Sequence, residues 1–338
     1  MARVFVGVPT LNRPRLVVET IDSLRGQTFS DFRVVVSDNG SAPEVADAVE
    51  RHIAAMNDPR FSFHRQPING GEYGQGWFFY DQAQPYEFMV VLHDDDLIDP
   101  DYLGEAVAAL DRAPTVDVFV ANPLVIDAES RVSESMTADY HRQHGRVGAT
   151  DGPYDIRTSH LLHGFTPISG TMFRVAGLRA SGFVDPDCHG NFPFEFNLFL
   201  RLGDIGAQGW FASRPLLRIR YHTDSFRGTH RILDNPHVVR TMLKLLERRT
   251  YSGAVERRRR IILGRLRRAD GLIRLRDGDL RGCRRQLVAA LGENASSPKA
   301  IAAAALAWGC PGLLRSRLPP VDRREIPPAA PRPMAQAG

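Results

Sequence analysis

VVLHDDDLIDP (Val90–Pro100) places three adjacent aspartates directly after an apolar run. The run, Phe88–Leu92, is hydrophobic at every position, which is typical of a strand covered on both faces. Three carboxylates at the end of such a strand repel one another, so their pKa values rise unless a cation neutralises them. An oxygen-rich site of this kind suits a hard divalent ion, magnesium or manganese. The alternative is that the aspartates cap the following helix or are solvated in a loop.

The same order of apolar run and polar loop occurs twice before this segment. Val4–Val8 is followed by PTLNR (Pro9–Arg13), and Phe32–Val36 is followed by SDNGS (Ser37–Ser41). Between the runs, LVVETIDSL (Leu16–Leu24) has the apolar spacing of a helix. Later in the chain, residues 122–153 are expected to be rich in loops. Strands that alternate with helices predict a parallel α/β sheet, whose ligands bind beyond the carboxyl ends of the strands.

Composition favours a globular protein of the cytoplasm. The three cysteines, Cys188, Cys283 and Cys310, are too few and too scattered for a disulfide framework or a cysteine zinc site. The N-terminus enters a strand-like run at once, without the pattern of a secretory signal. The longest apolar stretch near the other end, Ala300–Trp308, is too short to span a bilayer. We therefore expect a cytoplasmic location.

Positive charge gathers in the second half of the chain. The net charge is +4, and arginines crowd residues 257–285. No aromatic residues interleave with them to stack bases, so we expect no nucleic-acid partner. A solvated helical face is the plainer interpretation of these arginines. Peripheral contact with the anionic inner face of the cell membrane is the alternative.

Four segments, taken together, resemble the family 2 glycosyltransferases of the GT-A fold. They occur in the family's order and are the stretches Val4–Ser41, NGGEYGQGW (Asn69–Trp77), VVLHDDDLIDPDYL (Val90–Leu103) and ISGTMFRVAGLRASGFVDPD (Ile168–Asp187). The resemblance covers about Val4 to Arg227. It implies a mostly parallel sheet of GT-A type flanked by helices and followed by a helical C-terminal region.

The resemblance also implies an activity and a division of the chain. The activity is inverting transfer of a sugar from a nucleoside-diphosphate sugar to a hydroxyl-bearing acceptor, which is a glycan, a lipid-linked molecule or a secondary metabolite. Residues 1–228 would form the catalytic domain, with a nucleotide-binding half to about residue 120 and an acceptor half from 121 to 228. Residues 229–316 would form a helical region, and 317–338, rich in proline and alanine, a disordered tail.

Residue roles on the donor side follow from the same resemblance. Eight residues would bind the nucleotide sugar: Pro9, Thr10, Asn12, Arg13, Asp38, Asn69, Asp94 and Asp95. Asp94 and Asp96 form the Asp-x-Asp signature, and Asp96 would bind Mg²⁺ or Mn²⁺ directly, with His222 as a second ligand. Arg220 and Arg227 are candidates to pair with phosphate oxygens. Residues 76–83 are expected to form a helix, and core packing of this helix is the preferred role of Trp77.

The family places its general base in an acidic pair at the start of a helix. The corresponding stretch is NFPFEFNLFLR, in which Glu195 takes the aspartate's place and Phe194 replaces the preceding glutamate. The resemblance implies Glu195 as the base, with Asp185 and Asp187 as alternatives that also read as turn formers. Glu195 could instead complement the helix dipole. His93 is assigned no chemistry.

Two other functions stay open at this point. A catalytically inactive nucleotide-sugar-binding protein is suggested by the missing acid at Phe194. A nucleotidyltransferase would also need acidic metal ligands, but GVPTLNRPR lacks the glycine pattern usual in its first loop.

Overall fold

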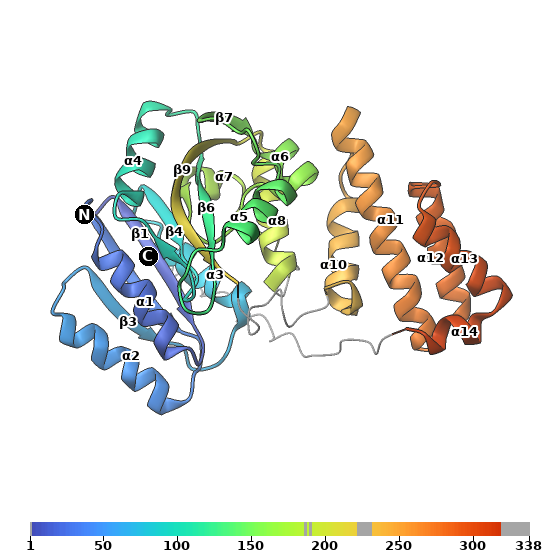
Figure 1. The fold of residues 1–338 in the computed structure, drawn as a ribbon, viewed down its shortest axis with the longest axis horizontal. Coiled ribbons are helices and arrows are strands. Elements are labelled where there is room, and N and C mark those ends of the chain that lie inside the picture. The colour runs from blue at the N-terminus through green and yellow to red at the C-terminus, as the bar shows by residue number, and fades with distance from the viewer. Residues whose placement is uncertain (1, 186–187, 189–190, 222–231, 319–338) are drawn as a thin grey trace, which may run out of the picture. The chain divides into compact units, whose positions relative to one another are not determined.

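The computed structural model describes residues 2–185, 188, 191–221 and 232–318, and Figure 1 labels most of their helices and strands. The described residues up to Tyr221 form one compact unit, and those from Ile232 onward form a second. The first unit is a sheet flanked by helices, whereas the second contains helices alone among its described residues.

The sheet of the first unit has nine strands within the described residues, in the order β3-β2-β1-β4-β8-β6-β9-β5, with β7 paired to β9. The strands are β1 (Val4–Thr10), β2 (Phe32–Asp38), β3 (Phe61–Arg65), β4 (Phe88–Val91), β5 (Leu97–Ile98), β6 (Val118–Ile126), β7 (Gly152–Asp155), β8 (Thr171–Arg174) and β9 (Gln208–Arg220). All of them run in one direction except β5, β7 and β8. The predicted fold class, a mostly parallel sheet flanked by helices and followed by a helical region, is confirmed.

Helices cover both faces of this sheet, because alternate residues of its central strands point to opposite sides. Val4, Val6 and Val8 pack in one apolar cluster with residues of α1 (Pro14–Arg25), α2 (Pro43–Met56) and α4 (Tyr102–Arg112). Phe5 packs in a second cluster with residues of α3 (Gly71–Gln82), α6 (Ile156–His163), α7 (Val175–Ala180) and α8 (Asn191–Asp204). Burial on both faces explains why the strand before the aspartates is apolar at every position.

Parallel pairing brings three loops to one edge of the sheet. β1 pairs in parallel with β2 on one side and with β4 on the other, and Thr10 lies in register with Asp38. The aspartates follow β4 after Leu92 and His93. The loops after β1, β2 and β4 therefore meet where the sequence predicted a ligand site.

Two elements differ from the sequence interpretation. The helix expected from Gly76 begins at Gly71, because Gly71 has a φ of 65° and its N–H donates to the Asn69 side chain over 2.9 Å. The stretch expected to be loop-rich, residues 122–153, contains α5 (Glu134–Gln143), which begins at Ser133, whose side chain accepts from the N–H of Met136. Both helix starts are accompanied by a hydrogen bond from a backbone N–H to a nearby side chain, which hydrophobic spacing does not record.

The second unit consists of a short 3₁₀ turn, η1 (Ile232–Asp234), and the helices α10 (Pro236–Glu247), α11 (Gly253–Arg276), α12 (Leu280–Glu293), α13 (Pro298–Gly309) and α14 (Pro311–Ser316). Its core includes Leu275, Cys283 and Leu287. Buried Asp270 pairs with both Arg240 and Arg274 at 2.9 and 2.7 Å, so part of the arginine cluster is neutralised internally. Among the described helices, none combines the length and apolar character needed to cross a bilayer.

Candidate active site

Asp94, Asp95 and Asp96 are buried together at the edge where β1, β2 and β4 end. Only 6, 9 and 3% of their surfaces are exposed. Burial and then the charge of Asp95 raise the pKa of Asp96 to about 7, although the charge of His93 opposes the rise. The same two causes raise the pKa of Asp94. The predicted mutual repulsion of the three carboxylates is therefore present in the folded chain.

Arg13 supplies part of the compensating charge that the sequence interpretation assigned to a metal ion. Its Nη1 lies 3.1 Å from an oxygen of Asp94 and 3.1 Å from an oxygen of Asp95. Thr10 Oγ1 donates a further hydrogen bond to Asp94 over 2.9 Å. Within the part of the chain that the structure describes, Asp96 has no arginine or lysine ion-pair partner. Asp96 is thus the carboxylate of the three that most needs an external cation.

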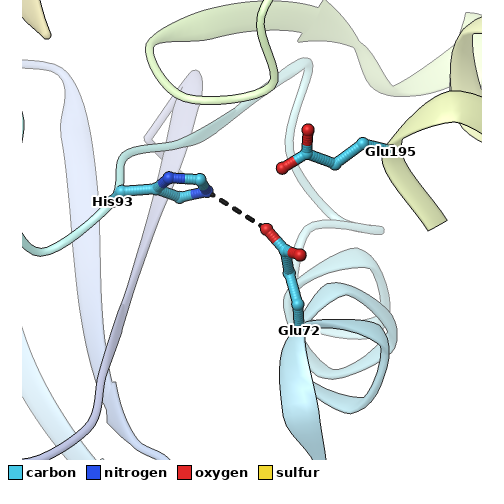
Figure 2. A group of neighbouring side chains, drawn as sticks. All are labelled: Glu72, His93 and Glu195. Carbon is cyan, nitrogen blue, oxygen red and sulfur yellow. Dashed lines mark ion pairs between the residues drawn. The ribbon is translucent and has the colours of Figure 1, made fainter. Parts of the chain in front are cut away.

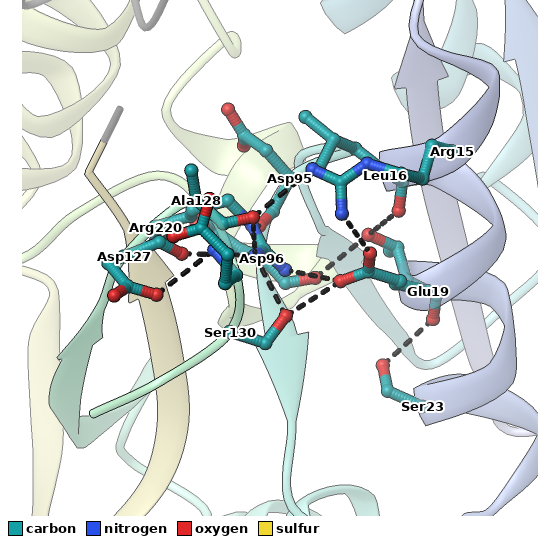
Figure 3. A network of polar contacts seen from close by, with 12 residues as sticks. Arg15, Leu16, Glu19, Ser23, Asp95, Asp96, Asp127, Ala128, Ser130 and Arg220 are labelled. Atoms are coloured by element: carbon teal, nitrogen blue, oxygen red, sulfur yellow. Dashed lines mark hydrogen bonds and ion pairs between the residues drawn. The ribbon is translucent and has the colours of Figure 1, made fainter. Parts of the chain in front are cut away.

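Arg220, at the end of β9, holds the aspartate loop in place (Figure 3). Its side chain is fully buried and pairs with Glu19 of α1 at 2.8 Å. Its Nε donates to the backbone oxygen of Asp95, its Nη1 to Ser130 Oγ, and its backbone N–H to Asp96 Oδ1, over 2.8, 2.8 and 2.9 Å. Because these contacts occupy the guanidinium, Arg220 acts as a positioning group, which corrects the expectation that it would bind phosphate.

The loops after β1 and β2 are tied to each other and to the start of α3. Asn12, with a φ of 55°, donates its N–H to Ser41 Oγ over 2.8 Å and accepts from the N–H of Ala42 over 2.9 Å. Buried Asp38 accepts from the N–H of Ser41 over 3.1 Å. The Asn69 backbone lies against Gly40, where an added Cβ would be 3.0 Å from its nitrogen. These contacts bring the predicted nucleoside-binding segments to one edge.

Glu195 and the aspartates share His93 as a neighbour. A ring nitrogen of His93 belongs to two groups of possible ligand atoms, and within each group the atoms lie within 4.8 Å of one another. The first group contains carboxylate oxygens of Glu72 and Glu195, and the second contains carboxylate oxygens of Asp95 and Asp96. Figure 2 shows the first group, in which Glu72 comes from α3 and Glu195 from α8. His93 Nε2 is 3.5 Å from Glu72 Oε1. Glu195 is therefore close to the aspartate site, and both lie near the imidazole of His93.

The protonation of this group depends on its mutual contacts. Burial lowers the pKa of His93, but the hydrogen bond and charge of Glu72, with the charges of Glu195 and Asp96, raise it to about 10. Burial likewise raises the pKa of Glu72, but the hydrogen bond and charge of His93 and a hydrogen bond with Glu195 lower it below its usual range overall. His93 is thus an imidazolium at neutral pH, between carboxylates.

Phe194, which replaces an acid in the resemblance, is a core residue. It is 3% exposed, and its ring lies 6.1 Å from that of Tyr73 and 5.7 Å from that of Phe183. A Cβ at Gly76 would meet the Phe194 ring at 2.4 Å, so α3 and α8 approach closely there. Trp77 packs 5.2 Å from Phe183, consistent with its expected place in the core.

The predicted site residues are brought together to different degrees. Thr10, Arg13, Asp94 and Asp95 contact one another directly, and Asp96 follows them in the same loop. Pro9 pairs with Ser37 inside the sheet. His222, Arg227 and Asp187 lie outside the described residues.

Sequence interpretation missed Glu72, His93 and Glu19. Glu72 was missed because its helix was expected to begin at Gly76. Glu19 lies on the polar side of α1, and no local signal connects it with Arg220 at the end of β9. His93 had a usable signal, since an imidazole next to three carboxylates is a natural partner for their charge.

Comparisons with known proteins agree with this geometry. A family profile described as Glycosyl transferase family 2 matches residues 5–174, half of the chain. Galactofuranosyltransferase GlfT2 of Mycolicibacterium smegmatis is 30% identical over 138 residues, a match that spans 38% of this chain but only 20% of that protein.

Solved structures show the likeness of fold. The crystal structure of S. aureus TarS 1–349 in complex with UDP-GlcNAc has a TM-score of 0.65 at 16% identity and covers 93% of this chain and 90% of its own. The structure of GalNAc-T7 with UDP, GalNAc and Mn²⁺ has a TM-score of 0.53 at 14% identity, covering 72% of this chain and 48% of that one. With the profile matching from the first strand to the end of β8, the chain belongs to glycosyltransferase family 2.

Proposed function

We propose that this protein is an inverting glycosyltransferase, which moves a sugar from a nucleoside-diphosphate sugar to a hydroxyl-bearing acceptor with the help of a divalent cation. One observation carries the proposal: the Glu195 carboxylate and two of the buried aspartates, Asp95 and Asp96, lie near the same imidazole, His93, at the edge where the strands end. Displacement at a sugar carbon needs a base on one side of that carbon and a site for the leaving diphosphate on the other. Family membership supports the same reaction class.

The donor side consists of the loops after β1 and β2. In our proposal Asp38 accepts a hydrogen bond from the base or ribose, and Pro9, Thr10, Asn12 and Asn69 line the nucleoside pocket. Arg13 holds Asp94 and Asp95, one of which we place nearer the ribose. The complex of TarS with UDP-GlcNAc supports a nucleoside-diphosphate sugar as the donor class.

The residues present fit a divalent cation at Asp96. The neighbouring donors are carboxylate oxygens, and the pKa of Asp96, raised to about 7, marks a charge that an ion would stabilise. When bound, Mg²⁺ or Mn²⁺ stabilises the negative charge that develops on the departing nucleoside diphosphate. His222 is the proposed second ligand. The Mn²⁺ in the GalNAc-T7 structure supports this choice of ion.

Glu195 takes the acceptor's proton in this proposal. The acceptor hydroxyl attacks the anomeric carbon from the face opposite the diphosphate, and Glu195 accepts its proton as the new bond forms. The close packing of Phe194 against Gly76 fixes the start of α8 and so limits where the Glu195 carboxylate can reach.

Turnover of a donor panel tests the proposal. We expect release of a nucleoside diphosphate from one nucleotide sugar with Mg²⁺ or Mn²⁺ present, and a product of inverted anomeric configuration by NMR. Donor binding without turnover would identify an inactive nucleotide-sugar-binding protein. Release of pyrophosphate from a nucleoside triphosphate would identify a nucleotidyltransferase.

We further propose that the second unit makes peripheral contact with an anionic membrane surface on the cytoplasmic side. In the described helices, the exposed residues Arg257, Arg265, Arg281 and Arg285 form no ion pair, unlike the paired arginines near Asp270. Flotation with acidic liposomes should show binding that high salt abolishes, because surface attraction is screened by salt. Equal flotation with neutral liposomes, or no binding at low salt, would contradict this contact.

A further inference from the structure

Glu72, His93 and Glu195 come from three elements and meet at one point (Figure 2). Glu72 is in the first turn of α3, His93 follows β4, and Glu195 is in the first turns of α8. Their ligand atoms lie within 4.8 Å of one another. The function proposed above uses Glu195 alone, so Glu72 and the contact it makes with His93 have no role in it yet.

The packing of α3 on α8 places Glu72 opposite Glu195. Residues four apart in a helix share a face, so Glu72 lies one turn before Gly76 on the same side of α3. Gly76 contacts Phe194, the neighbour of Glu195. Replacing the glycine hydrogen with a larger group would separate the two helices and, with them, the two glutamates.

Hydrogen bonds with two asparagine side chains also fix the backbone at the start of α3. The N–H of Gly70 donates to Asn39 Oδ1 over 3.0 Å, and the N–H of Gly71 donates to Asn69 Oδ1 over 2.9 Å. Asn39 directly follows β2, on the donor side of the site. Glu72 therefore starts from a backbone that is anchored to the nucleoside-binding loops.

The contacts of Glu72 connect the acceptor side with the aspartate loop. One of its carboxylate oxygens lies within 4.8 Å of an oxygen of Glu195 and 3.5 Å from His93 Nε2. His93 in turn is anchored by its backbone N–H, which donates to Ser169 Oγ over 3.0 Å. A glutamate side chain has three rotatable bonds, so a carboxylate held by such neighbours keeps a position that it would otherwise leave for much of the time.

We propose that Glu72 is a positioning residue for sugar transfer, which together with His93 holds the Glu195 carboxylate at a fixed place beside the aspartate site. The proposal rests on the function proposed above. Glu72 acts through Glu195, and it need not touch donor or acceptor. Displacement of a reacting group by about 1 Å can cost about 10²-fold in rate, which gives such a contact a measurable effect.

A double-mutant cycle tests this role. In the wild-type background, Glu72→Gln keeps the size of the side chain but removes its charge, and we expect kcat to fall about tenfold or more while the donor KM changes less than about twofold. Glu72→Asp should recover part of the loss. In the Glu195→Gln background, Glu72→Gln should cause no further loss, because there is no base left to position.

Matched controls separate this role from a structural one. Asp81→Asn removes an exposed acid from the same helix and should leave kcat unchanged. The thermal shift that nucleoside diphosphate causes should be equal in Glu72→Gln and the wild type, although the variant melts at a lower temperature because it loses the ion pair with His93. Equal fractional losses of kcat in the two backgrounds, or a higher donor KM with unchanged kcat, would overturn the positioning role.

The two proposals can fail separately. If the wild type transfers sugar and Glu72→Gln matches it, only the positioning role is wrong. If the wild type releases no nucleoside diphosphate from any donor, the proposed function is wrong and the positioning role falls with it.

Discussion

Asp96 is the aspartate of the triplet whose charge the described residues compensate least. Arg13 lies between Asp94 and Asp95, whereas Asp96 has a hydrogen bond from the backbone N–H of Arg220, one with Ser169 and the nearby charge of His93. Burial and the charge of Asp95 raise its pKa to about 7, far above the value of about 3.9 for an aspartate in an unfolded chain. Ionisation of Asp96 therefore lowers the free energy of unfolding unless a cation binds the carboxylate.

A pH series on Asp96→Asn measures that cost. Between about pH 4 and pH 7 the folded wild type keeps a proton that the unfolded chain has lost, so its stability falls as pH rises through this window. In excess chelator we expect the melting temperature of the wild type to fall by a few degrees relative to Asp96→Asn between about pH 5 and pH 8. A difference that does not change with pH would show that Asp96 carries no such cost.

Glu195→Gln removes the proposed base and keeps the shape of the side chain. We expect transfer to fall about 10²-fold or more, with donor binding unchanged, since an amide cannot accept the acceptor's proton. Single-turnover kinetics and a thermal shift with the donor nucleotide would measure the two quantities separately. Wild-type transfer by this variant would exclude Glu195 from the role.

At the scale of elements, the site depends on contacts that fix β9 and α1 against the aspartate loop. Arg220 ends β9 and reaches Glu19 of α1, Ser130 and the backbone of Asp95 (Figure 3). A planar guanidinium can serve these separate acceptors at once, whereas the single nitrogen of a lysine cannot. β9 ends two residues before the proposed ligand His222 in the sequence, so these contacts fix the chain up to Arg220.

Arg220→Lys should therefore weaken both the fold and the site. We expect a loss of about 1–3 kcal/mol in the free energy of unfolding, because buried acceptors lose their donors. Cation-dependent binding of nucleoside diphosphate should also weaken. Denaturant unfolding and calorimetric titration measure the two effects, with Arg218→Lys, an exposed change on the same strand, as the control. Equal behaviour of the two variants would contradict the positioning role of Arg220.

Elements that depend on hydrophobic pattern were predictable from the sequence, whereas the contacts between distant elements were not. The runs at Val4–Val8 and Phe88–Leu92 predicted buried parallel strands and put the aspartates at a sheet edge. The start of α3 at Gly71 depends on the Asn69 side chain, so Glu72 was not expected in a helix. Its meeting with Glu195 depends on how α3 packs on α8, which neither segment encodes alone.

At the scale of the whole first unit, the sheet itself assembles the site. Parallel pairing of β1 with β2 and β4 brings the residues after these strands to one edge, as Thr10 and Asp38 show by their register. β9, parallel to β6, carries Arg220 to the same loop from far along the chain. The short motifs that carry the family resemblance thus lie at neighbouring strand ends of one sheet. α8 brings Glu195 to the same site.

Calorimetric titration of nucleoside diphosphate into the full chain tests most directly whether a divalent cation links the aspartates to the leaving group. With Mn²⁺ present we expect the wild type to bind at least about tenfold more tightly than in excess chelator, while Asp96→Asn binds equally in both conditions. Wild-type affinity that chelator leaves unchanged would contradict the account.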